Sequence, residues 1–366
     1  MEEWKEYKLG DVLTIKYGKD HKQLADGDIP IYGSGGIMRY GERSLYDGPS
    51  ILIPRKGSLN NVIYADKPFW TVDTMFWSII NDSIANPLFV YYSICKKDFA
   101  SLNVGSAVPS LTVPVIEDID ILLPSKATQD KVVSVLKSLD DKIELNRHIN
   151  DNLEQQAQAL FNYYFIDTPE LLGEFSVGSL ADAANYVNGL AMQKYRPING
   201  EKGLPVLKIK ELGQGRIDSS SDFCSNEIDS YYKVYDGDVI FSWSGTLMVK
   251  IWCGGKCGLN QHLFKVSSKT TPKWFYYFWT KHHLDNFIRI AKDKAVTMGH
   301  IKRGELEKAE VLFPNNSVMK KLDTLMAPFL DQIIEKECEI RKLALLRDTL
   351  LPKLISGELK INDINN

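Results

Sequence analysis

Residues 132–164 read VVSVLKSLDDKIELNRHINDNLEQQAQALFNYY, and this stretch decides the fold. Taken in alternating steps of four and three, its positions are apolar except at Asn146 and Asn150. An apolar period of 3.5 residues sustained over this length predicts a long helix that packs in a coiled coil. The positions, which we call the first seam, are Val132, Leu136, Leu139, Ile143, Asn146, Asn150, Leu153, Ala157, Leu160 and Tyr164.

The same pattern returns 190 residues later, in LDTLMAPFLDQIIEKECEIRKLALLRDTLLPKL at 322–354. Two copies of one seam predict a chain made of two equivalent halves, with long helices over about 127–165 and 317–356. Pro328 lies inside the second helix, where it would either kink the helix or start it anew. The second seam is Leu322, Met326, Phe329, Ile333, Lys336, Ile340, Leu343, Arg347, Leu350 and Leu354.

Shorter similarities extend the duplication upstream of the seams. They occur in the same order in both halves, which makes an internal repeat the simplest explanation. The matched pairs are Asp11 and Gly18 with Asp182 and Gly189, Ile29–Ile31 with Leu204–Val206, Tyr46–Gly48 with Tyr235–Gly237, Pro87–Tyr92 with Pro272–Tyr277, and Leu123–Pro124 with Phe313–Pro314.

The segments before each long helix read as short strands separated by Gly, Pro, Asn and Asp, with one helix apiece. The fold class is therefore α+β, with two repeated mixed α/β globules separated by two long antiparallel coiled-coil helices. The expected strands are 12–17, 30–32, 50–54, 61–64, 71–80, 206–209, 238–243 and 249–252, and the expected helices are 86–100 and 274–290.

The two seams should pair antiparallel, because each helix leads away from one globule and toward the other. Two-fold symmetry then sets Leu139 against Arg347 and Asn150 against Lys336. A polar pair in an apolar seam can fix the register of a coiled coil. Equally, Asn150 and Lys336 can be solvated breaks in the seam, and the sequence leaves both readings open.

Composition excludes several classes of protein. The chain has 366 residues, of which 44% are hydrophobic and 25% charged, as in ordinary globular domains. We find no signal-peptide pattern and no apolar run long enough to cross a membrane. The odd number of cysteines, five, favours a reducing cytoplasm. The net charge of −3 is uninformative by itself, but neither half is strongly basic, which counts against tight DNA binding by the chain without partners.

Catalytic and metal-binding patterns fail on inspection. The Gly33–Gly36 run lacks the Lys-Ser/Thr of a phosphate-binding loop. Neither an amino-methyltransferase motif nor a glycine fingerprint for S-adenosylmethionine is present. Cys224, Cys253, Cys257 and His262 could supply zinc ligands, but the other half has no counterpart, so no metal site is predicted. The aromatic run Trp274–Trp279 is expected to be helix core.

Three segments resemble the specificity (S) subunits of type I restriction-modification systems. These are Leu139–Asn146 (LDDKIELN), continuing to Phe161, then Arg347–Leu359 (RDTLLPKLISGEL), and the opening Lys8–Asp11 (KLGD). The resemblance covers essentially the whole chain and implies two target-recognition domains held apart by two helices. The implied boundaries are 1–125 and 169–314 for the recognition domains, and 126–168 and 315–360 for the spacer helices.

The resemblance further implies that each domain recognises one half of a split DNA sequence. The helices would seat methylation (M) subunits, probably two, and restriction (R) subunits could join. The chain would then be a non-catalytic subunit without a cofactor, and S-adenosylmethionine would bind the partner methylation subunit. A helix over residues 132–164 spans about 48 Å at about 1.5 Å per residue. That length corresponds to about 14 base pairs, so the helix could set the spacing between the half-sites.

Polar loops in the globules are the candidates for DNA contact, because they offer backbone donors and side chains suited to phosphates or base edges. Each could also be a solvated turn. The candidates in the first half are Tyr32, Ser34, Gly35, Arg39 and Arg43 in one flexible loop, and Arg55, Lys56, Ser58 and Asn60 in another. The candidates in the second half are Gln193, Lys194 and Arg196, together with Ser242, Ser244, Thr246 and Lys250.

Two other functions are considered beside DNA specificity. The chain could be a coiled-coil scaffold that joins two globules binding ligands other than DNA. It could also be a nuclease or methyltransferase in its own right, but it lacks a recognisable catalytic constellation.

Overall fold

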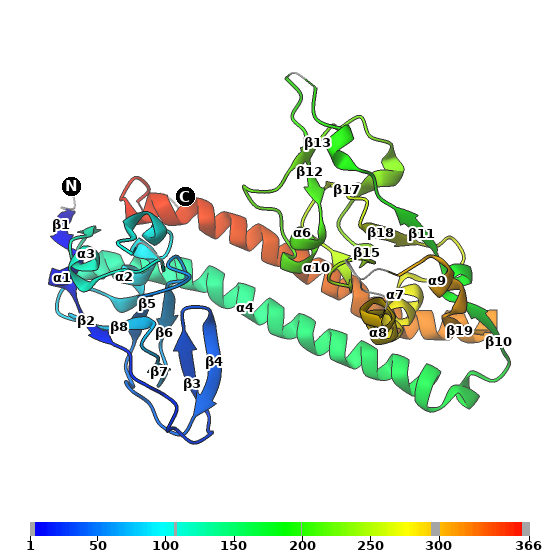
Figure 1. The fold of residues 1–366 in the computed structure, drawn as a ribbon, viewed down its shortest axis with the longest axis horizontal. Coiled ribbons are helices and arrows are strands. Elements are labelled where there is room, and N and C mark those ends of the chain that lie inside the picture. Colours follow the sequence, from blue (N-terminus) through cyan, green and yellow to red (C-terminus); the bar gives the residue numbers. More distant parts are fainter. Residues whose placement is uncertain (1–3, 106–107, 199, 294–300, 361–366) are drawn as a thin grey trace. The chain divides into compact units, whose positions relative to one another are not determined.

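The computed structural model describes residues 4–105, 108–198, 200–293 and 301–360. The chain forms two compact units, one of Met1–Asp141 with Ala344–Asn366 and one of Lys142–Leu343. The two long helices, α4 (Lys126–Asn162) and α10 (Asn316–Ile355), each contribute to both units (Figure 1). Each unit therefore contains one globule and a stretch of each long helix.

The first unit holds two small sheets and a two-stranded pairing beside short helices. The strand orders are β2-β8-β5-β6, β4-β3-β7 and β1-β9. The elements are β1 (Lys5–Lys8), α1 (Leu9–Val12), β2 (Leu13–Tyr17), β3 (Ile29–Gly33), β4 (Gly36–Gly41), β5 (Ser50–Pro54), β6 (Ile63–Ala65), β7 (Trp70–Thr71), β8 (Met75–Ile80), α2 (Pro87–Ile94), the 3₁₀ turn Phe99–Leu102, α3 (Val113–Glu117) and β9 (Asp120–Leu123).

The second unit repeats this arrangement with strand orders β11-β18-β15-β16, β13-β12-β17-β14 and β10-β19. After α4, a π-helical turn at Tyr163–Asp167 and a 3₁₀ turn at Pro169–Leu172 lead into it. Its elements are β10 (Phe175–Ser179), α5 (Leu180–Ala183), β11 (Asn185–Asn188), the 3₁₀ turn Met192–Lys194, β12 (Leu204–Leu207), α6 (Ile209–Gln214), β13 (Phe223–Cys224), the 3₁₀ turn Ser230–Tyr232, β14 (Lys233–Val234), β15 (Asp238–Ser242), β16 (Met248–Trp252), β17 (Cys257–Leu259), β18 (Leu263–Ser267), α7 (Lys273–His282), α8 (Leu284–Asp293), α9 (Gly304–Lys308) and β19 (Glu310–Pro314).

The internal duplication is confirmed by this topology. Each strand of the first unit has a counterpart in the second, in the same sheet order and pairing direction, and β14 is an addition to the second. The pairings β3 with β7 and β12 with β17 are parallel in both units. The matched aspartates Asp11 and Asp182 each accept a backbone hydrogen bond three residues upstream, from Lys8 at 3.1 Å and Ser179 at 2.8 Å.

The long helices pack antiparallel within each unit. In the second unit, Asn150 Nδ2 donates to Glu337 Oε1 at 2.9 Å. In the first unit, Arg347 Nη1 donates to Asp140 Oδ1 at 2.7 Å, one position from the expected Leu139. Val132 and Leu354, another expected pair, lie in the same buried cluster.

Burial follows the heptads of the predicted seams, with local shifts. Leu136, Ile143, Asn150 and Ala157 are buried at intervals of seven, as are Met326, Ile333 and Ile340. At three positions the buried residue lies one place after the predicted one, because the helix is not held there to a period of 3.5 residues per turn. Phe161, Leu330 and Leu351 are buried, whereas the predicted Leu160, Phe329 and Leu350 are only partly buried, as are Leu139, Leu153 and Leu343.

The prediction that Asn150 faces Lys336 is wrong by one residue. Asn150 is 6% exposed and contacts Glu337, so the polar contact across the seam exists. Lys336 instead pairs with Glu339 of its own helix, at 3.0 Å. Pro328 does not restart the helix, because α10 is continuous from Asn316 to Ile355.

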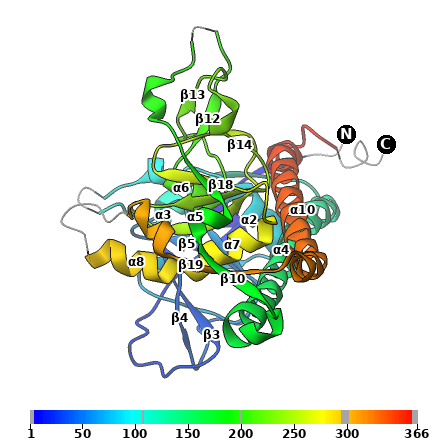
Figure 2. The same cartoon turned by 90° about the vertical axis from the view of Figure 1, so that its right-hand side faces the viewer.

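The expected helix over 274–290 is in fact two, α7 and α8, and α7 carries the aromatic core. All six residues of Trp274–Trp279 are buried, as predicted. Helix α7 packs against α5, β16 and β18, and Figure 2 shows it beside α5 and β18. Every helix in the described part of the chain is too short or too polar to span a bilayer.

The segment that follows Tyr32 is not a flexible loop, contrary to expectation. Strands β3 and β4 form an antiparallel hairpin, with Gly33 opposite Gly36 and a register shift at Ile31/Tyr32. The sequence Ser34-Gly35 is the two-residue turn, and Gly36 has φ +117°. Glycine adopts positive φ at little cost, so Gly36 lets the chain enter β4 directly after the turn.

Candidate functional site: two equivalent cavities

The two candidate segments of the first half lie beside each other. Asn61 Nδ2 donates to the Ser34 carbonyl at 2.9 Å, which ties the loop after β5 to the turn of the β3–β4 hairpin. Gly57 has φ +89°, and a Cβ there would lie 2.9 Å from Ser34 Oγ. The structure therefore brings together the two segments that the sequence singled out separately.

An open cavity of about 820 Å³ adjoins this hairpin. Three separate segments line it: the stretch after β2, the hairpin, and the turn between β7 and β8. The lining residues are Asp20, His21, Lys22, Gly33, Ser34, Gly35, Gly36, Ile37, Met38, Val72, Asp73 and Thr74.

A second cavity, of about 320 Å³, lies in the second globule. It too is lined by the stretch after the first strand of a sheet, here β11, and by the turn between β17 and β18. The lining residues are Met192, Gln193, Arg196, Val206, Lys208, Asp222, Phe223, Asn260, Gln261 and His262.

Matching backbone hydrogen bonds show that the two cavities occupy equivalent places. The N–H groups of Gly18 and Gly189 donate to the carbonyls of Met75 and Leu263, both at 3.1 Å. The next residue in each half repeats the match. The Lys19 N–H donates to the Thr71 carbonyl at 2.8 Å, and the Leu190 N–H donates to the Leu259 carbonyl at 2.9 Å. The third pair is Val72 to Tyr32 at 3.0 Å and Asn260 to Leu207 at 3.1 Å.

The two glycines of this pattern are required by close backbone approach. A Cβ at Gly18 would lie 2.0 Å from the Val72 carbonyl oxygen, and one at Gly189 would lie 2.2 Å from that of Asn260. No side chain fits at either distance. Val72 is thereby matched with Asn260, and the following residues match in turn, Asp73 with Gln261 and Thr74 with His262.

The turn residues of the two cavities thus share a backbone frame and differ in chemistry. Asp73 offers only hydrogen-bond acceptors when ionised, whereas the amide of Gln261 both donates and accepts. Sequence reasoning missed Asp73, Thr74, Gln261 and, as a cavity residue, His262. The sequences around the two turns share no motif, and only the matching strand pairings show which residues of the two turns are equivalent.

The predicted candidates of the first half lie in different surroundings. Arg39 lies on β4 and donates to His21, Leu24 and Asp26, so it holds the hairpin to the preceding loop. Arg43 is exposed, with its guanidinium 5.9 Å from the Trp70 ring centre. Burial raises the pKa of Tyr32, which lies on β3.

The loop after β5 is anchored by its backbone. The N–H groups of Arg55 and Lys56 both donate to the Thr74 carbonyl, at 2.8 and 3.2 Å. The Arg55 side chain lies over the Tyr17 ring, and its Nη1 donates to the Asp73 carbonyl at 3.3 Å. Lys56 and Ser58 are exposed. Asn60 is exposed and bonded to Asp98 and Ala100.

In the second half, the structure brings Gln193, Arg196 and Ser244 together. Gln193 and Arg196 line the second cavity, and the buried Ser244 Oγ lies 3.0 Å from Nδ1 of His262. Ser242 is fully buried and its hydroxyl donates to the Ser244 carbonyl.

The remaining candidates of the second half lie outside this set of residues. Lys194 and Thr246 are exposed. Lys250 Nζ donates to the Gly213 carbonyl of α6 at 2.8 Å, so it is engaged at the end of that helix.

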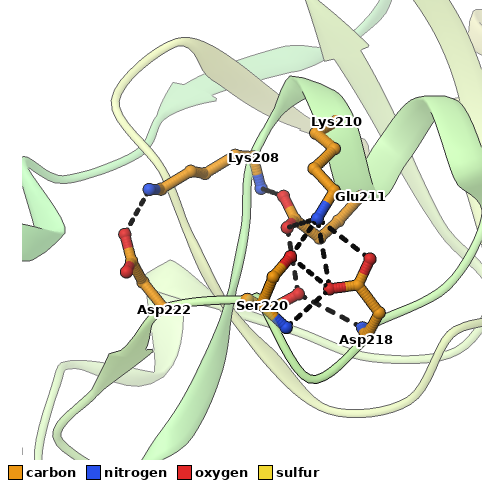
Figure 3. Close-up of polar contacts among 7 residues, drawn as sticks. Lys208, Lys210, Glu211, Asp218, Ser220 and Asp222 are labelled. Carbon is orange, nitrogen blue, oxygen red and sulfur yellow. Dashed lines mark hydrogen bonds and ion pairs between the residues drawn. The ribbon is translucent and has the colours of Figure 1, made fainter. Parts of the chain in front are cut away.

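A polar cluster around α6 (Figure 3) includes two residues that line the second cavity, Lys208 and Asp222. The Glu211 carboxylate, buried on α6, accepts from the Lys208 N–H at 3.2 Å and the Ser221 hydroxyl at 2.9 Å. Lys208 pairs with Asp222, and both residues line the cavity.

Lys210 holds the adjoining turn of this cluster by pairing with Asp218 at 2.9 Å. Hydrogen bonds from Ser220 and Lys210 lower the pKa of Asp218. The turn that carries Asp222 is thus held by charged and neutral hydrogen bonds at several points.

The cysteines do not form a metal centre in the part of the chain that the structure describes, where no group of three or more His, Cys, Asp or Glu side chains could hold a metal ion. Burial raises the pKa of Cys257 to about 12 and that of Cys224 to about 11. Both thiols are therefore neutral at physiological pH and pack in the apolar interior.

A known family of domains matches the chain twice, once in each half. The family model for the type I restriction modification DNA specificity domain matches residues 1–155 and 173–346. The chain therefore belongs to the family of type I restriction-modification specificity subunits.

Individual relatives agree with this assignment. The chain is 26% identical over 394 residues to the type I restriction enzyme MjaIX specificity subunit of Methanocaldococcus jannaschii, covering 98% of this chain and 89% of that protein. It is 24% identical over 192 residues to the HindI specificity subunit of Haemophilus influenzae, covering 46% of this chain and 42% of that protein.

A solved structure shares the fold. The S subunit of a type I restriction-modification system from M. genitalium superposes with a TM-score of 0.62 over 97% of this chain and 96% of that one. At 14% sequence identity, this similarity supports the fold alone.

Proposed function

We propose that this chain recognises a bipartite DNA target, with one half-site for each globule, on behalf of a type I restriction-modification complex. The observation that carries the proposal is the pair of cavities built on one backbone frame with different side chains. A shared frame presents each half-site to the same place in its globule, and different side chains select different bases.

The first half-site would be contacted by the β3–β4 hairpin and the loop after β5, where Arg55 and Lys56 are the leading candidates. The second half-site would be contacted by Gln193, Arg196 and the turn between β17 and β18. Arg39 and Lys250, which are engaged by protein carbonyls, would support these surfaces rather than select bases.

The long helices would dock methylation subunits, two in the simplest symmetric arrangement, and restriction subunits could join. Leucines exposed on both long helices are the candidate contacts for these subunits. Leu145 is 52% exposed, Leu325 40%, Leu345 69% and Leu346 47%. S-adenosylmethionine would bind the methylation subunit, and this chain would act in the cytoplasm without catalysing a reaction.

The test is expression of the chain with its cognate methylation subunit, followed by mapping of methylated adenines. We expect methylation at one split sequence, and none when the purified chain is given S-adenosylmethionine alone. Exchange of residues 1–124 for the equivalent domain of a relative should change one half of that sequence. A change in both halves would contradict independent recognition, and methyl transfer by the chain alone would contradict the non-catalytic role.

A further inference from the structure

Gln261 is held at the second cavity by its backbone. It lies in the turn between β17 and β18, and its N–H donates to the Leu190 carbonyl at 2.9 Å. The next residue, His262, receives a further constraint, because its N–H donates to Asn260 Oδ1 at 3.3 Å. The turn therefore presents the side chain of Gln261 to the cavity from a fixed backbone.

A chain of hydrogen bonds orients the Gln261 amide. Gln261 Nε2 lies 3.2 Å from Nε2 of His262, whose Nδ1 lies 3.0 Å from the Ser244 hydroxyl. An amide nitrogen only donates, so Nε2 of His262 must be the acceptor. Nδ1 of the same ring then faces the Ser244 hydroxyl. Ser244 is 5% exposed, so the series of hydrogen bonds ends on a buried, fixed side chain.

Within the described residues, the Gln261 amide makes no side-chain hydrogen bond besides the one with His262, which leaves one edge of the amide for a ligand. The contact with His262 uses one hydrogen of Nε2, and the second hydrogen and Oε1 form an adjacent donor and acceptor. Such an edge matches adenine in the major groove, where N7 accepts and the N6 amino group donates. Arg196 is exposed, lines the same cavity and is suited to a neighbouring phosphate.

We propose that Gln261 recognises an adenine in the second half-site, and that His262 and Ser244 are positioning residues that hold its amide. The inference rests on the proposed function and adds the base and the side chain. In the first globule the equivalent residue is Asp73, whose carboxylate cannot donate to N7, so that position would select a different base.

The experiment uses the full chain with its cognate methylation subunit and a DNA library randomised in both half-sites, and reads out methylated sequences. For Gln261→Ala, discrimination should fall by roughly 10- to 100-fold at one position of the second half, with the first half unchanged. Gln261→Glu should move the preference at that position toward cytosine, whose N4 amino group donates to a carboxylate. Exposed Gln214 of α6 supplies a matched control, and Gln214→Ala should leave the sequence unchanged.

His262→Ala should relax the same position partially, with the salt dependence of DNA binding unchanged, because no phosphate contact is lost. Unaltered specificity in both Gln261 variants would overturn the inference, as would relaxation in the first half. If the wild-type complex methylates without sequence preference, the proposed function itself fails, and that outcome is visible before any variant is compared.

Discussion

The hydroxyl of Tyr277 donates to Oε1 of Glu154 at 2.7 Å, which joins α7 of the second globule to α4. Lys281 Nζ lies 2.6 Å from the same oxygen. Burial alone would raise the pKa of Glu154, but the hydrogen bond from Lys281 and its charge outweigh burial and lower it. The first unit has a corresponding contact, in which Tyr92 donates to Asp140 on α4 at 2.6 Å.

Glu154→Gln should therefore destabilise the second unit at neutral pH by about 1 kcal/mol, discounted for partial exposure of the pair. A lowered carboxyl pKa stabilises the fold above the ordinary glutamate value of about 4.3. That contribution is lost as the pH falls through the lower folded value. Urea unfolding from pH 7 to pH 3 should show the gap between wild type and variant closing in acid. Glu174→Gln, at an exposed position, is the control, and a gap that stays constant with pH would refute the assignment.

Asn150→Leu should stabilise the antiparallel helix pair by roughly 1 kcal/mol. Asn150 is buried in the apolar seam, and its Oδ1 has no hydrogen-bond partner in the part of the chain that the structure describes. An unpaired buried acceptor costs about 1–3 kcal/mol, and partly exposed Glu337 can return to water. Thermal unfolding measures the change, with exposed Asn152→Leu as the comparison. A destabilised Asn150→Leu would show that the Glu337 contact is worth more than the apolar seam.

Insertion of one heptad into each long helix, after Asn146 and after Lys336, should lengthen the recognised spacer. Each insertion adds about 10.5 Å of helix, or about three base pairs, and preserves the seam. Because each insertion is one whole heptad, both seams keep their apolar period and the helices can still pair antiparallel. Mapped methylation sites should keep both half-sites and differ in spacing. An unchanged spacer would exclude the helices as its determinant.

Arg55→Ala and Lys56→Ala should weaken DNA binding by the partnered complex in different ways. The planar guanidinium of Arg55 suits bidentate contact with guanine, so its loss should cost about 1–3 kcal/mol at one position of the first half. Lys56 is an exposed point charge, so its loss should weaken binding to all sequences and reduce the salt slope by about one. Binding titrations against salt distinguish these effects, with exposed Lys67→Ala as the control. If both variants bind like wild type, the hairpin turn becomes the leading candidate.

The long helices and the duplication were predictable because their signals are long and periodic. An apolar residue every three or four positions leaves few alternatives to a packed helix, and Gly357, with φ +75°, follows the end of α10 where glycine commonly follows a helix. Periodicity does not determine which of two neighbouring apolar residues is buried, and for this reason the burial of Leu330 rather than Phe329 was not predicted.

The cavities were only partly predictable. Candidate loops were found from polar and glycine-rich composition, but Gln261 and Asp73 owe their equivalence to parallel strand pairing between segments with little sequence in common. The hairpin was missed for a related reason. A glycine-rich run such as Gly33, Gly35 and Gly36 occurs both in irregular loops and in tight turns. Only the pairing of β3 with β4 distinguishes the two structures.

The close approach at Gly18 and Gly189 has a consequence for how such a protein diverges. The frame of each cavity is held by bonds between main-chain atoms, which are indifferent to the side chains exposed on the turn. Substitutions at Asp73 or Gln261 can therefore accumulate without repacking the globule, while the two glycines cannot change at all. In a saturation-mutagenesis map, each half should show one intolerant glycine next to a permissive turn, and new target sequences should arise at the permissive sites.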